Sequence, residues 1–182
     1  MANNQVLRKI GSPTQIVLAD TTDFDDTPVA QTDQIDMTSQ ADGAAIQSDK
    51  FDFGAEWGDL YDVHCEFEVD VAPASGEVIS VYLAPSLEAG AALGNPGGVV
   101  GADGAYTGTA GDSLADSLFQ LDFIGNVICT ADADPVMQVQ SFAYSPHARY
   151  ATLVVVNDSG QAFVGDATHH YVMFTPIVPE VQ

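Results

Sequence analysis

Residues 60–71, LYDVHCEFEVDV, alternate between apolar and polar side chains from Tyr61 onward. A β-strand turns successive side chains to opposite faces of its sheet, so a period of two is typical of a strand with one buried and one solvent-facing side. The buried face would carry Tyr61, Val63, Cys65, Phe67, Val69 and Val71. The other face would carry His64 and the acidic residues Asp62, Glu66, Glu68 and Asp70. We therefore expect a sheet with one dry side and one strongly anionic side.

Similar patterns predict strands along most of the chain, about nine in total. The others fall at residues 15–19, 45–53, 78–84, 117–130, 136–144, 150–157, 162–165 and 170–178. Residues 154–156 and 171–174 are almost continuously apolar, which favours central strands. A bulge or bend is expected at Gly125-Asn126 and a hairpin turn at residues 157–160. No segment shows helical spacing.

The chain has 182 residues, which suits one domain of ordinary size. We divide it into an N-terminal arm, residues 1–13, and a single β-sandwich domain, residues 14–182. Within the domain, residues 85–111 form a long loop that is rich in Gly and Ala and lacks alternation. Loops of this length are usually functional or ordered by a partner, and we expect this one to be ordered by neighbouring subunits.

Many strands, no helix and one long loop favour an all-β fold, an antiparallel two-sheet sandwich of the jelly-roll type. An immunoglobulin-like sandwich is the alternative. Trp57 precedes Cys65 instead of lying between Cys65 and Cys129, so the Cys–Trp–Cys order of that fold is missing.

The charge of the chain is strongly one-sided, with 26 acidic residues against four basic ones and a net charge of −22. A nucleic-acid-binding protein or one that docks on anionic lipid needs many Lys and Arg side chains, so we expect neither partner. No apolar run is long enough for a transmembrane helix, and no apolar stretch follows the first basic residues, so no secretory signal is expected.

Four aspartates in a loop-like segment are a weak calcium candidate: Asp20, Asp23, Asp25 and Asp26. Calcium prefers hard oxygen ligands, but the glycine and glutamate of an EF-hand loop are missing here. A solvated acidic loop is the simpler interpretation, and no other cofactor is expected.

The histidines and cysteines form no spacing that is typical of a zinc site. His169 and His170 are adjacent and would point apart on a strand, and we expect the histidines to lie at the surface. Cys65 and Cys129 fall on apolar strand faces, so we expect two buried core thiols, with a disulfide between them left open. No motif assigns a catalytic residue, and we expect a protein that is not an enzyme.

Four segments of the second half stand out: residues 92–98 (ALGNPGG), 121–130 (LDFIGNVICT), 144–150 (YSPHARY) with 153–157 (LVVVN), and 174–179 (FTPIVP). With these segments the chain resembles small virion structural proteins of tailed bacteriophages. The resemblance implies a β-sandwich or jelly-roll module that decorates the capsid as a cement protein or belongs to a tail or fibre. It implies no catalytic residues.

The function expected from this resemblance is capsid decoration by bridging capsomers, in a virion assembled in the bacterial cytoplasm. The partners would be the major capsid protein or other virion proteins, and the chain would form a homo-oligomer, with a trimer favoured. The alternative is a glycan-binding module of a tail or fibre, using Trp57 or Tyr106. The candidate partner-binding residues lie in the arm and the long loop: Arg8, Lys9, Asn95, Pro96 and Tyr106.

Overall fold

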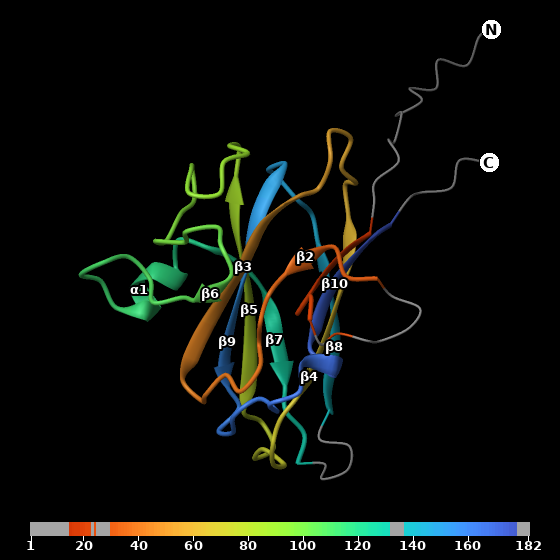
Figure 1. Ribbon diagram of the computed structural model, residues 1–182, viewed down its shortest axis with the longest axis vertical. Helices are drawn as coiled ribbons and strands as arrows, with labels where there is room; N and C mark the ends of the chain where they lie inside the picture. The colour runs from red at the N-terminus through yellow and green to blue at the C-terminus, as the bar shows by residue number, and fades with distance from the viewer. Residues whose placement is uncertain (1–14, 23, 25–29, 132–136, 178–182) are drawn as a thin grey trace, which may run out of the picture.

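A computed structural model describes residues 15–22, 24, 30–131 and 137–177, and the structural statements below refer to these. Two five-stranded sheets pack face to face (Figure 1). One sheet has the strand order β2-β1-β10-β4-β8 and the other β6-β3-β9-β5-β7. The strands are β1 (Ile16–Ala19), β2 (Asp33–Gln34), β3 (Ala44–Asp52), β4 (Tyr61–Glu68), β5 (Val78–Ser86), β6 (Gly104–Ala105), β7 (Asp122–Ile128), β8 (Met137–Tyr144), β9 (Tyr150–Asp158) and β10 (Tyr171–Pro176).

The strand pairing is that of a jelly roll. Four antiparallel pairs are nested along the chain: β1 with β10, β3 with β9, β4 with β8, and β5 with β7. This long double-stranded ribbon is rolled up so that β10 also pairs with β4, and β9 with β5. The short strands β2 and β6 extend the two sheets at one edge each. The predicted all-β two-sheet sandwich is therefore confirmed, and the nested order is the jelly-roll one.

The core lies between the sheets and contains the predicted apolar face of β4. Its residues from Tyr61 to Val69 are at most 1% exposed at every second position. Val71 is an exception to the prediction, because it is 59% exposed. The strand ends at Glu68 and makes one further bridge, between Val69 and Phe163, before the chain leaves the sheet.

The predicted central strands are confirmed, because β9 and β10 each lie between two neighbours in their sheets. The predicted bulge is also confirmed, since the register between β5 and β7 shifts where Val81 faces Gly125 and Tyr82 faces Phe123. Gly125 is required there for another reason: an added Cβ would lie 2.3 Å from the ring of Phe142 on β8.

Three sequence predictions are wrong in detail. Residues 117–121 belong to no strand, because a short helix, α1 (Leu114–Leu118), is capped by Ser113, whose side chain accepts a hydrogen bond from the Asp116 amide. Residues 162–165 form only the single bridge at Phe163. Residues 157–160 make a turn but no hairpin, because the next strand, β10, lies in the opposite sheet.

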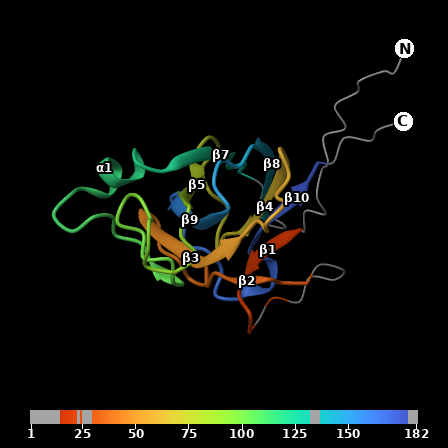
Figure 2. The same cartoon turned by 90° about the horizontal axis from the view of Figure 1, so that it is seen from above.

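The long segment between β5 and β7 folds back over the outer face of the β9 sheet (Figure 2). It covers a second cluster of buried apolar side chains on that face. The cluster contains Ala45, Ala84, Val99, Tyr106, Leu121, Val154 and Val156, with Tyr82, Leu114 and Leu118 packed against it. Residues 85–111 thus have packing contacts within their own chain, which the sequence analysis did not expect. Binding of this segment to neighbouring subunits stays a prediction.

Lys50 on β3 fastens this segment at its start. Its ammonium nitrogen lies within hydrogen-bond distance of four oxygens: the Ser86 hydroxyl at 3.1 Å and the carbonyl oxygens of Glu88, Gly90 and Leu93 at 3.1, 2.9 and 2.7 Å. Its three N–H groups are shared among them. Burial lowers the pKa of Lys50 from its ordinary value. A single positive charge thus gathers four acceptors at the start of the loop.

Candidate partner-binding surface

The loop residues predicted to bind a partner lie largely inside the loop. The Asn95 amide donates to the carbonyl oxygens of Ala91 and Val99, at 2.7 and 3.1 Å, and Pro96 is half-buried. Tyr106 is 3% exposed, and its hydroxyl donates to the Gly97 carbonyl oxygen. The interpretation of Tyr106 as an aromatic platform for a glycan is therefore wrong, because its ring belongs to the second apolar cluster.

Arg8 and Lys9 lie outside the described residues, so their partner-binding role stays a prediction. The two basic residues within the described part, Lys50 and Arg149, are both engaged by their own chain. Arg149 holds Asp52 through two hydrogen bonds of 2.8 and 2.7 Å, and this contact lowers the pKa of the Asp52 carboxyl. In the part of the chain that the structure describes, acidic side chains therefore far outnumber basic ones.

The calcium candidate is only partly visible, since Asp23, Asp25 and Asp26 lie outside the described residues. Asp20 is buried, and its carboxylate accepts hydrogen bonds from the Thr22 amide at 2.6 Å and the Gln34 side chain at 3.2 Å. Among the described residues, no three His, Cys, Asp or Glu side chains gather as metal ligands would. A calcium site at this loop stays a prediction.

The buried thiols are as predicted, because Cys65 and Cys129 are both core residues with free sulfhydryls. Burial raises the pKa of Cys129 to about 11, which makes this thiol a poor nucleophile at neutral pH.

One histidine departs from the surface prediction: His170 is 1% exposed. Its Nδ1 accepts a hydrogen bond from the Glu68 amide at 3.2 Å, and burial lowers its pKa.

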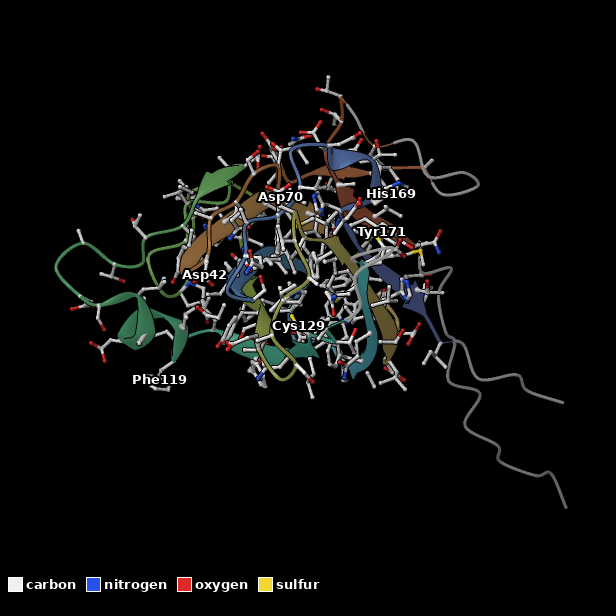
Figure 3. All side chains as sticks on the ribbon, turned by 90° about the horizontal axis from the view of Figure 1, so that it is seen from below. Asp42, Asp70, Phe119, Cys129, His169 and Tyr171 are labelled. Atoms are coloured by element: carbon white, nitrogen blue, oxygen red, sulfur yellow. The ribbon has the colours of Figure 1, made fainter. Side chains whose placement is uncertain are left out.

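A serine, a histidine and a glutamate meet on the outer face of the β4 sheet. His64 Nδ1 lies 3.1 Å from the Ser141 hydroxyl, and its Nε2 lies 3.6 Å from Glu66 Oε2. The second distance is too long for a hydrogen bond, and that same oxygen already accepts one from the Tyr171 hydroxyl at 3.0 Å. The set therefore links β8, β4 and β10 across the sheet (Figure 3 labels Tyr171).

The most distinctive open surface is a groove on the outer face of the β9 sheet, at the end of the long segment that covers this face. It has a volume of about 420 Å³ and is lined by Ser80, Tyr82, Ala115, Leu118, Phe119, Leu121, Phe123 and Asn126. The short helix α1 forms one wall, and the outward faces of β5 and β7 form the floor. We call this the aromatic groove.

Two phenylalanines make this surface unusual. Phe119 is 87% exposed at the end of α1, and Phe123 is 56% exposed on the edge strand β7 (Figure 3 labels Phe119). The Phe123 ring packs against the ring of Tyr82, with centroids 5.3 Å apart. Two large rings exposed on one opening make this groove a candidate interaction site.

The aromatic groove has polar groups at its floor, and acidic side chains lie on or next to the elements that form it. The Ser80 hydroxyl donates to Asn126 Oδ1 at 2.8 Å. Asp116 is exposed on α1, and Asp158 lies at the end of β9, close enough for its charge to add to the effect of burial in raising the pKa of Tyr82. The groove therefore suits an apolar ligand that carries positive charge.

Sequence reasoning missed this groove because it assigned residues 117–130 to one strand. The signal that could have revealed it is Ser113 followed three residues later by Asp116, a pattern typical of a helix N-terminus. The break between helix and strand places Phe119 and Phe123 on the same opening instead of along one strand face.

A second, smaller hollow of about 370 Å³ lies between the long loop and the turn before β9. It is lined by Pro85, Ser86, Leu87, Glu88, Gly94, His147 and Ala148. Leu87 is 81% exposed at its margin. This hollow offers one large exposed apolar side chain and no phenylalanine, tyrosine or tryptophan ring, so it is the weaker candidate for a binding site.

The fold and the groove define a jelly-roll protein with an exposed aromatic surface. Comparison with protein-family models gives no match for the chain, and comparison with curated proteins gives none either. In the part of the chain that the structure describes, no helix is both long and apolar enough to cross a membrane.

Proposed function

We propose that this chain is a non-enzymatic structural protein of a virion, a capsid decoration protein that bridges capsomers. The observation that carries the proposal is the aromatic groove, with Phe119 and Phe123 exposed on an ordered jelly roll. Such a surface is costly to leave in water, and burial against a protein partner removes that cost.

Two further features support the same function. Jelly rolls are frequent among capsid proteins, although this is support by analogy of fold only. The net charge of −22 would repel packaged nucleic acid, which fits a position on the outside of a shell.

The alternative is a glycan-binding module of a tail or fibre. The hydrogen-bonded Ser80–Asn126 pair beside the rings of Tyr82 and Phe123 favours it, because sugars bind through aromatic faces together with hydroxyl and amide groups. Trp57, which is 36% exposed, remains the second candidate platform.

Mass spectrometry of density-purified phage particles from the natural source tests the proposal. We expect the chain in the head fraction, at a fixed copy number comparable to that of the capsomers. Its absence from purified particles would contradict a virion role. Its presence at a few copies in a separated tail fraction would favour the glycan-binding alternative, for which a glycan array with wild type and Phe119→Ser is the next measurement.

A further inference from the structure

We infer that the aromatic groove binds the N-terminal arm of a second copy of this chain, through residues 6–10. This deepens the proposed function, because it rests on the groove being an assembly surface. It does not depend on which particle is assembled.

The first argument is the chemistry of the groove. Its lining combines the exposed rings of Phe119 and Phe123 with the aliphatic side chain of Leu118. Asp158 lies close enough to Tyr82 in this lining for its charge to act on the Tyr82 hydroxyl. Asp116 is exposed on α1, whose residues Ala115 and Leu118 line the groove. A complementary segment carries several apolar side chains next to two positive charges.

The second argument is that such a segment occurs in this chain. Residues 6–10 read Val-Leu-Arg-Lys-Ile, so they place two adjacent cations between apolar residues. Arg8 and Lys9 are half of the four basic residues of the chain. The other two are engaged elsewhere, Lys50 by the long loop and Arg149 by Asp52. Charge complementarity within the chain therefore points to the arm.

The third argument is the direction in which the arm joins the domain. The arm leads into β1, which belongs to the sheet opposite the one that carries the groove. In Figure 2, β1 and α1 lie on opposite sides of the sandwich. An arm that leaves one sheet and binds the other sheet of a neighbour makes a head-to-tail contact. Repeated contacts of this kind close into a ring when the rotation permits, which suits a small cyclic oligomer such as a trimer.

The test is complementation between two full-length variants, measured by light scattering coupled to gel filtration. The variant Phe119→Ser has a damaged groove and an intact arm. The double variant Arg8→Ser/Lys9→Ser has an intact groove and a damaged arm. We expect wild type to form oligomers and each variant alone to associate at least about tenfold more weakly. An equimolar mixture should form heterodimers, because one intact arm meets one intact groove.

Leu87→Ser is the matched control, since it removes an exposed apolar side chain from the other hollow and should leave the oligomer unchanged. Circular dichroism checks that each variant is folded as wild type. A monomeric wild type, or an oligomer that Phe119→Ser leaves intact, overturns the inference. Variants that fail to pair in the mixture also overturn it, because they indicate that the arm binds within its own chain or to another protein.

The two proposals fail separately. Absence of the chain from purified particles removes the virion role while complementation can still support the arm and groove. Presence in particles without complementation keeps the virion role and removes this contact.

Discussion

At the level of single residues, the core face of β4 can be tested with a pair of substitutions. Phe67 is fully buried, and its ring stacks on Phe163 with centroids 5.5 Å apart. We expect Phe67→Ala to lower the free energy of unfolding by about 3–5 kcal/mol, because it leaves a cavity between the sheets. Val71→Ala should change it by less than about 0.5 kcal/mol, since Val71 is exposed. Urea denaturation measures both, and a large loss for Val71→Ala would contradict the observed strand end.

His170 predicts a pH dependence of stability. Burial lowers its folded-state pKa below the ordinary value of 6.5, so the unfolded chain takes up a proton before the folded chain does. The contribution of His170 to stability is therefore greatest above pH 6.5 and falls as the pH drops from there toward the folded-state pKa. His170→Gln should flatten this slope in urea denaturation at pH 7.5 to 5.5, which samples roughly one unit on either side of a histidine pKa.

A slope that His170→Gln leaves unchanged would show that groups other than His170 account for the loss of stability.

At the level of elements, the attachment of the long loop depends on Lys50. We expect Lys50→Met to lower the free energy of unfolding by about 1–2 kcal/mol, because the carbonyl oxygens of Glu88, Gly90 and Leu93 lose their shared donor. Limited proteolysis should then cut within residues 87–93. Arg149→Met is the comparison, since it removes an exposed ion pair that contributes little. An unchanged cleavage rate in Lys50→Met would show that the second apolar cluster alone holds the loop.

Backbone geometry in the same loop gives another prediction. Gly98 has φ +73°, and an added Cβ would lie 2.5 Å from the Thr109 backbone nitrogen. Gly43 has a similar φ of +75° with open space around it. Both substitutions to Ala strain the backbone, but only Gly98→Ala forces two segments apart. Its cost, measured by thermal denaturation, should exceed that of Gly43→Ala by about 1–3 kcal/mol. Equal costs would mean that the two segments can separate freely.

The sequence predicts features that depend on local patterns and misses those that depend on contacts between distant segments. Alternation in β4 and the apolar runs of β9 and β10 are local signals of burial, and they led to the correct sheets. Burial on the outer face of the β9 sheet depends on residues 85–121 folding back over it. No local periodicity in the sequence predicts this long-range packing. The groove lies where this covering segment ends, between Phe119 and Phe123. Its position therefore could not be predicted without the three-dimensional structure.

At the scale of the whole molecule, the dominant property is uncompensated negative charge. The chain carries 26 acidic residues, and within the described part both basic residues are held by neighbours in their own chain. Burial raises the pKa of Asp33, Asp103 and Asp158, with nearby aspartates adding to the effect in each case. The folded state thus concentrates like charges that the unfolded chain holds farther apart, and this repulsion lowers its stability.

Screening of that repulsion gives the last prediction. Raising NaCl from about 0.01 to 0.15 M shortens the Debye length from about 30 to 8 Å, so we expect Tm to rise by several degrees. Differential scanning calorimetry measures this, and a Tm independent of NaCl would contradict strong self-repulsion. CaCl₂ and MgCl₂ at equal concentration should raise Tm equally if the divalent ions only screen. A larger rise with CaCl₂ that Asp20→Asn abolishes would instead establish the calcium site predicted at Asp20, Asp23, Asp25 and Asp26.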